Sequence, residues 1–149
     1  MIQALRKQAL RGGAIAALLL FSGCSTFNRD WKAAAAKPTP ADSIEGSWEG
    51  KWLSGHNGHN GRLRALIRKL DSGQYETRFH AKYGVVFSFG MQANLDVKPV
   101  GGQWQFSGEE DLGRPYGVYR YEGQASATNF HSTYKASFDH GTFQMTRPK

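Results

Sequence analysis

The stretch Tyr75-Glu-Thr-Arg-Phe79-His-Ala-Lys-Tyr83 decides the fold of this chain. Apolar or aromatic side chains occupy almost every second position, and charged or polar side chains stand between them. Because the side chains of a β-strand alternate between its two faces, this period of two predicts a strand with one buried face. Gly84 interrupts the pattern, and residues 85–96 then repeat it with a second apolar face that includes Phe89.

Six further segments show the same alternation, at residues 46–52, 62–70, 104–106, 117–125, 129–138 and 142–147. Runs of Gly, Asn, Asp and Pro separate them, as in residues 71–73, 98–102 and 139–141, and such runs are typical of turns. Residues 109–116, Glu-Glu-Asp-Leu-Gly-Arg-Pro-Tyr, are expected to form the longest polar loop. No long segment of residues 44–149 has the period of a helix, so the sequence predicts an all-β domain there.

Eight strands that each carry one apolar face can hide their edges by closing on themselves. The predicted architecture is therefore an antiparallel eight-stranded up-and-down barrel, and a two-sheet β-sandwich is the alternative. The opening Gly46-Ser-Trp48 also resembles the first strand of lipocalin-like and avidin-like barrels. A barrel of eight strands encloses either its own side chains or one small ligand.

The segment Leu18-Leu-Leu-Phe21-Ser-Gly-Cys24 ends a short apolar run that follows three basic residues. This order of a basic region, an apolar region and small residues is that of a secretory signal. Ser22-Gly-Cys24 resembles the lipobox of bacterial lipoproteins, although Phe21 stands where that family usually has Leu. The resemblance implies removal of residues 1–23, a diacylglyceryl thioether on Cys24, and acylation of the new amino terminus. The alternative is an ordinary signal or a membrane helix, but the run is shorter than the ~20 residues a membrane span needs.

Residues 24–43 are expected to form a flexible tether between the lipid and the domain of residues 44–149, since Lys37-Pro-Thr-Pro40 is typical of an extended spacer. Ser25, rather than Asp, follows the cysteine, which in Gram-negative lipoproteins favours the outer membrane. The resemblance therefore implies a lipid-anchored protein of the cell envelope, on the periplasmic face of the outer membrane.

Charge and composition exclude several classes of function. The formal net charge is +7, of which the basic residues of the signal contribute three, leaving +4. This mild excess, without a recognition helix or RNA-binding motif, does not indicate a nucleic-acid partner. The single cysteine leaves no disulfide, so the core alone must hold the domain together.

The sequence offers only weak candidates for metal-binding or catalytic residues. His56 and His59 stand in a glycine-rich loop, but zinc needs about four ligands, so we expect neither a metal nor another cofactor. The acidic run of residues 109–111 lies in one loop, whereas a glycosidase places two carboxylates across a cleft. The chain has no Gly-x-Ser-x-Gly motif. An envelope enzyme that acts on a lipid or a glycan therefore remains only the alternative.

The aromatic side chains offer the best candidates for binding. By strand parity, seven of them share the inner face and could line a ligand pocket: Trp48, Trp52, Phe79, Phe89, Tyr119, Tyr121 and Tyr134. The other interpretation is that these rings simply fill the core. A pocket lined by Trp and Tyr suits an apolar or amphipathic ligand. The sequence thus favours a binding or structural module, holding a small apolar ligand or contacting another envelope protein.

Overall fold

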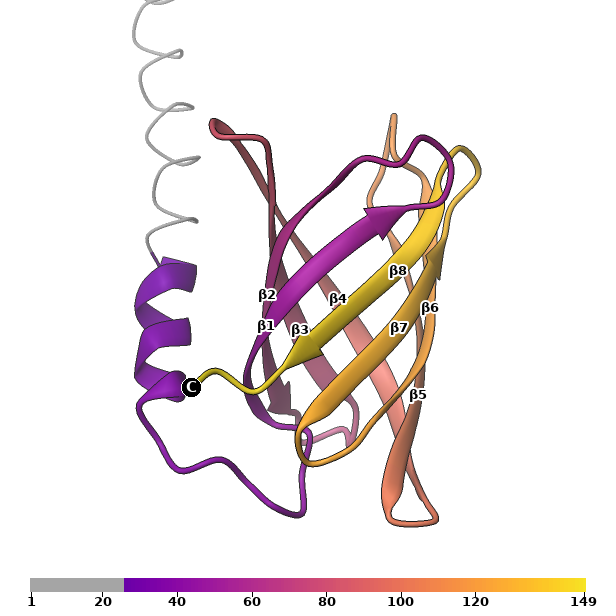
Figure 1. Cartoon of the computed structure of the whole chain (residues 1–149). Helices are drawn as coiled ribbons and strands as arrows, with labels where there is room; N and C mark the ends of the chain where they lie inside the picture. The colour runs from indigo at the N-terminus through magenta and orange to yellow at the C-terminus, as the bar shows by residue number, and fades with distance from the viewer. Residues whose placement is uncertain (1–25) are drawn as a thin grey trace, which may run out of the picture.

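The computed structural model describes residues 26–149 and contains one closed antiparallel barrel, with strands in the order β1 to β8 (Figure 1). The strands are β1 (Gly46–Ser54), β2 (Asn60–Lys69), β3 (Tyr75–Tyr83), β4 (Phe87–Val100), β5 (Gln103–Asp111), β6 (Val118–Ala125), β7 (Asn129–Lys135) and β8 (His140–Thr146). Each strand pairs with its neighbour in sequence, and β1 pairs with β8 to close the ring. The predicted eight-stranded up-and-down barrel is confirmed, and the two-sheet alternative is wrong.

The alternating side chains meet inside the barrel. In β3, for example, Phe79 and Ala81 are 2% and 1% exposed, whereas Lys82 is fully on the outside. The register with β2 places Ala65 opposite Phe79 and Leu63 opposite Ala81, so small and large side chains alternate across the interior. This packing agrees with the parity that the sequence predicts.

Several strands are longer or shorter than expected. β5 continues to Asp111, so residues 109–111 belong to a strand and not to a loop. These residues pair with β6, where Arg120, Tyr119 and Val118 lie opposite them, and the side chains of Glu109 and Arg120 also form an ion pair of 2.7 Å. β4 likewise runs through Pro99 to Val100, and β7 ends at Lys135, earlier than expected.

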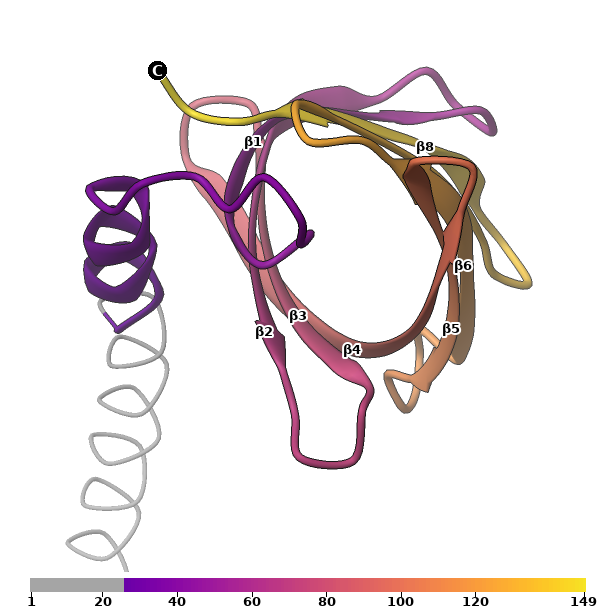
Figure 2. The same ribbon diagram turned by 90° about the horizontal axis from the view of Figure 1, so that it is seen from below.

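One end of the barrel is filled, and we call it the closed end. Ile44 and Trp48 are completely buried there, and the Trp48 Nε1–H donates to the Ile44 carbonyl at 2.9 Å. The Arg147 guanidinium lies 3.8 Å from the centre of the Trp48 ring and donates to the carbonyls of Ser43 and Glu45. Seen from below, the chain that leads into β1 curls over the edge of this end (Figure 2).

Residues 26–35 are helical and lie against the outside of the barrel (Figure 1). Phe27 and Trp31, one helical turn apart, are 4% and 8% exposed. The expectation of a flexible tether over residues 24–43 is therefore wrong for this part, because two large aromatic side chains hold it to the barrel wall. Within residues 26–149 no helix is long and apolar enough to cross a membrane.

Candidate functional site

The end of the barrel opposite the closed end, which we call the mouth, contains a cavity of about 510 Å³. The side chains that line it come from six strands and from the loops after β5 and β7: Trp52, Ala81, Phe89, Gly90, Met91, Leu112, Tyr116, Tyr119, Tyr134, Phe138, Asp139 and Phe143. Aromatic rings form most of this surface. The volume falls within the usual range of pockets for small molecules, about 300–1,000 Å³.

The floor of the cavity is a cluster of stacked rings. The Phe143 ring centroid lies 5.3 Å from that of Phe79 and 5.0 Å from that of Tyr134. Tyr121 stacks on Phe79 at 6.0 Å, and its hydroxyl contacts the Met91 sulfur at 3.4 Å. These distances are those of favourable aromatic pairs, so the floor is packed. The open space lies above it.

Asp139 is the polar anchor of the wall. Its carboxylate accepts hydrogen bonds from the Ser54 hydroxyl at 2.6 Å and from the Tyr134 hydroxyl at 3.0 Å. Burial, with help from this carboxylate, raises the pKa of Tyr134, so the phenol remains a donor at neutral pH. Among the described residues of the lining, Asp139 is the only carboxylate. The lining therefore lacks the pair of opposed carboxylates that a glycosidase uses.

Tyr119 offers a different polar group. Its ring stacks between Tyr121 and Tyr134, at 6.3 and 6.1 Å. Burial raises the pKa of its hydroxyl, which keeps the group neutral. Within residues 26–149 this hydroxyl forms no hydrogen bond with the protein, unlike that of its neighbour Tyr134, which donates to Asp139. The Tyr119 hydroxyl is therefore available to bond a polar atom within the cavity.

The strand pairing around the mouth is incomplete on one side. β4 pairs with β5 only from Leu95 to Val100, whereas it pairs with β3 along its whole upper part, from Phe87 onward. Figure 1 shows β4 and β5 close together at the closed end and apart at the mouth. Phe89, Gly90 and Met91 line the cavity from this unpaired part of β4. On this side, the wall of the mouth is formed by a part of β4 that has no hydrogen-bonded neighbour in β5.

The structure divides the seven candidate pocket residues into three groups. Trp52, Phe89, Tyr119 and Tyr134 line the cavity, Phe79 and Tyr121 form its floor, and Trp48 lies at the closed end. Phe89 is 46% exposed, so it lies at the rim and not in the packed interior that parity suggests. The indole Nε1–H of Trp52 donates to the Lys82 carbonyl at 2.9 Å, which fixes that wall.

The other candidates lie outside the cavity lining. His56 and His59 lie in the β1–β2 loop at the same end of the barrel, and the His59 ring is 4.8 Å from the Tyr83 ring. Among residues 26–149 no group of three or more His, Cys, Asp or Glu side chains is arranged to hold a metal ion. Cys24, the candidate for lipidation, lies outside the described residues.

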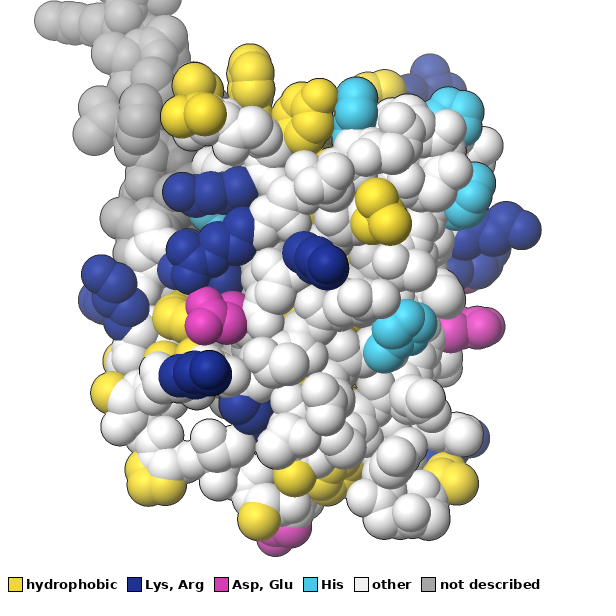
Figure 3. Space-filling model, viewed as in Figure 1, with side chains coloured by type: hydrophobic (Ala, Val, Ile, Leu, Met, Phe, Trp, Pro, Cys, Tyr) yellow, Lys and Arg dark blue, Asp and Glu magenta, His cyan; other side chains and the backbone are white. Residues whose placement is uncertain are grey.

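Exposed apolar side chains surround the mouth. Figure 3 shows hydrophobic side chains projecting from the upper end of the molecule, where the β3–β4 hairpin lies. Val85, Val86 and Phe87 in this hairpin are 98%, 82% and 70% exposed. Exposed apolar patches of this kind mark surfaces that interact with proteins or membranes.

A second set of residues holds the helix of residues 26–35 to β2 and β3. The Phe27 ring stacks on His80 at 5.2 Å and lies beneath the guanidinium groups of Arg64 and Arg78, at 5.4 and 5.5 Å. The Trp31 Nε1–H donates to the Trp48 carbonyl at 3.1 Å. His80 points outward, as expected, but this helix covers it to 6% exposure.

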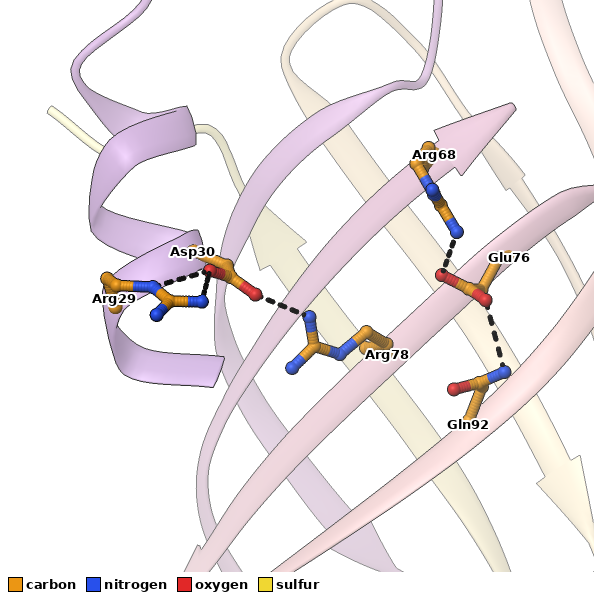
Figure 4. Close-up of polar contacts among 6 residues, drawn as sticks. All are labelled: Arg29, Asp30, Arg68, Glu76, Arg78 and Gln92. Atoms are coloured by element: carbon orange, nitrogen blue, oxygen red, sulfur yellow. Dashed lines mark hydrogen bonds and ion pairs between the residues drawn. The ribbon is translucent and has the colours of Figure 1, made fainter. Parts of the chain in front are cut away.

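Ion pairs reinforce this contact, as Figure 4 shows. Asp30 on the helix accepts from Arg78 on β3 at 3.0 Å and from its neighbour Arg29 at 3.0 Å. These hydrogen bonds lower the pKa of the Asp30 carboxyl. Sequence reasoning missed this group, although Phe27, Asp30 and Trp31 are three to four residues apart, which is the spacing of one face of a helix.

Comparison of the chain with models of known protein families, with curated proteins and with solved structures found no match.

Proposed function

We propose that this protein is a lipid-anchored, non-enzymatic barrel of the cell envelope that binds a small, largely apolar ligand in its mouth. The observation that carries the proposal is the aromatic cavity of about 510 Å³ at one end of a barrel whose other end is filled. A filled barrel would have no such space, and a channel would be open at both ends. The cavity instead resembles a binding pocket with one entrance region.

The lining limits the chemistry of the ligand. The stacked rings favour a flat or compact apolar ligand, because burying the apolar surfaces of the rings and of the ligand away from water lowers the free energy. The Tyr119 hydroxyl, which has no hydrogen-bond partner within the described residues, suits one hydrogen-bond acceptor on that ligand. The Asp139 carboxylate disfavours an anionic group at that part of the wall, since like charges repel at close range. We therefore propose a neutral ligand with a single polar substituent.

The anchor rests on the sequence. The basic region, the short apolar run and Cys24 together support lipidation, and the acylated amino terminus would hold the protein at a bilayer surface. A chain that carries Cys24→Ser should no longer incorporate a labelled fatty acid. Equal incorporation by the wild-type chain and the variant would overturn the anchor.

A matched pair of variants tests the pocket. Tyr119→Ala removes part of the cavity wall, whereas Tyr75→Ala removes a half-buried tyrosine near the closed end. A fluorescent apolar probe should bind the full wild-type chain and the Tyr75→Ala variant alike, and its affinity should fall with Tyr119→Ala. Equal affinities in all three proteins would overturn binding in the mouth. Native mass spectrometry of the protein from its own membranes would then identify any retained ligand.

A further inference from the structure

The exposed hydrophobic side chains are distributed very unevenly over the barrel. Among the residues that the structure describes, nine large hydrophobic side chains are exposed, and eight of them surround the mouth: Leu53, Tyr83, Val85, Val86, Phe87, Phe89, Tyr116 and Phe138. Val100 alone lies at the other end, beside the turn between β4 and β5. Scattered surface apolar residues need no explanation, but a cluster confined to one end does.

The β3–β4 tip, which we define as residues 83–87, is the extreme part of this cluster. Its sequence, Tyr-Gly-Val-Val-Phe, contains no charged side chain and no Asn or Gln. Gly84 adopts a positive φ of 61° that turns the chain, and the two following valines point into solvent. β5 does not pair with the upper part of β4, so no strand lies beside the tip on that side. On the other side, Tyr83 at the base of the tip packs against His59 of the β1–β2 loop.

The tip lies on the side of the barrel where the chain leads back to Cys24. Phe27 stacks on His80, and Val85 is five residues beyond His80, about 16 Å along an extended strand and nearer 12 Å along the axis of a tilted barrel. Cys24 is three residues before Phe27, so the two Cα atoms are at most about 11 Å apart. A lipid on Cys24 and the tip can therefore reach the same plane.

From this placement we infer that the β3–β4 tip inserts into the interface of the bilayer that holds the lipid anchor, so that the mouth faces the membrane. The exposed valines and Phe87 would enter the region between headgroups and acyl chains, where aromatic side chains are favoured. Lys82, which is exposed beside the tip and forms no ion pair within the described residues, would meet lipid phosphates. The inference rests on the proposed anchor for its orientation, and it makes the bilayer the source of the ligand.

The experiment uses the full chain, processed in a lipoprotein-producing host and reconstituted into vesicles of phosphatidylethanolamine and phosphatidylglycerol. The variant Val86→Cys receives an environment-sensitive nitrobenzoxadiazole dye at the tip. Val100→Cys is the matched control, because it places the same dye on an exposed valine at the opposite end. A thioether at Cys24 cannot react with the dye, so each variant takes a single label.

We expect the dye at residue 86 to show blue-shifted emission and to lose intensity when the vesicles contain lipids with a quencher near the headgroup. The dye at residue 100 should show neither change. Equal spectra and equal quenching at the two positions would overturn insertion of the tip while leaving the anchor intact. Dye uptake by the wild-type chain would reveal a free Cys24 thiol, which overturns the proposed anchor and, with it, this orientation.

Discussion

Replacing Phe79 and Phe89 by alanine should lower the stability of the barrel by very different amounts. The two residues lie on the neighbouring strands β3 and β4, and the alternation of side chains places both on the inner face. Phe79 is 2% exposed and packs on Tyr121 and Phe143. A phenylalanine ring of at least about 150 Å², at about 25 cal/mol per Å², gives roughly 4 kcal/mol of transfer free energy, and measured Phe→Ala losses are about 3–5 kcal/mol. Phe89 is 46% exposed, so about half of its area is buried and its removal opens no closed cavity. We expect a loss of about 1–2 kcal/mol there.

Urea unfolding followed by circular dichroism measures the difference. With a slope of about 2 kcal/mol per M, Phe79→Ala should lower the midpoint by about 2 M and Phe89→Ala by less than about 1 M. The loss at residue 79 is a large fraction of a typical domain stability of about 5–15 kcal/mol, so Phe79→Leu, with an expected loss of about 1–2 kcal/mol, is the milder companion. Equal midpoints for the two alanine variants would refute the assignment of a packed floor and an open rim.

Three further outcomes follow from the contacts outside the cavity. Trp31→Ala removes the hydrogen bond to the Trp48 carbonyl and should release the helix of residues 26–35 without unfolding the barrel. Hydrogen exchange should then show lost protection in the helix alone, and loss of protection in the strands as well would contradict this. Burial and then the charges of Arg64 and Lys82 lower the pKa of His80, so the released form binds its proton more readily than the docked form. Docking should therefore weaken as the pH falls below about 6.5, and His80→Gln should remove that dependence in proteolysis assays; an unchanged pH profile would contradict the assignment. Arg147→Met should cost about 2–3 kcal/mol by thermal unfolding, because it leaves carbonyl groups of the closed end without their donor, and a wild-type midpoint would show that water replaces the guanidinium.

The sequence predicted the barrel because its strongest signals are local. Alternation over residues 75–83 defines both the strand and its inner face. Eight such faces favour a closed barrel but also allow a two-sheet sandwich, and the pairing of β1 with β8 decides between them. The same argument fails for residues 109–111, where an acidic run suggested a loop. Their strand depends on pairing with residues 118–120 of β6, and the sequence alone does not reveal which residues will lie opposite one another.

The candidate site could be predicted only in part, for a related reason. Parity tells which face a ring occupies but not its height along the barrel, so Trp48 and Trp52 received the same interpretation although one fills the closed end and the other lines the mouth. The docked helix was missed because its partners, Arg64 and Arg78, occupy polar positions of strands, and the sequence pattern predicts that such positions face solvent. Their role depends on Phe27, which lies far away in the sequence.

The helix packed along the barrel wall determines which end of the barrel an anchor at Cys24 would hold nearest to a membrane. β1 begins at the closed end of the barrel. If residues 24–43 were a flexible, extended linker, they would join the barrel at that end and place it up to about 70 Å from an anchor at Cys24. The chain instead runs down the outside of the barrel as a helix and returns upward only in β1 (Figure 1). An anchor at Cys24 would then hold the barrel with its mouth toward the membrane and within one barrel length of the membrane surface. The barrel could not reach partners farther from the membrane.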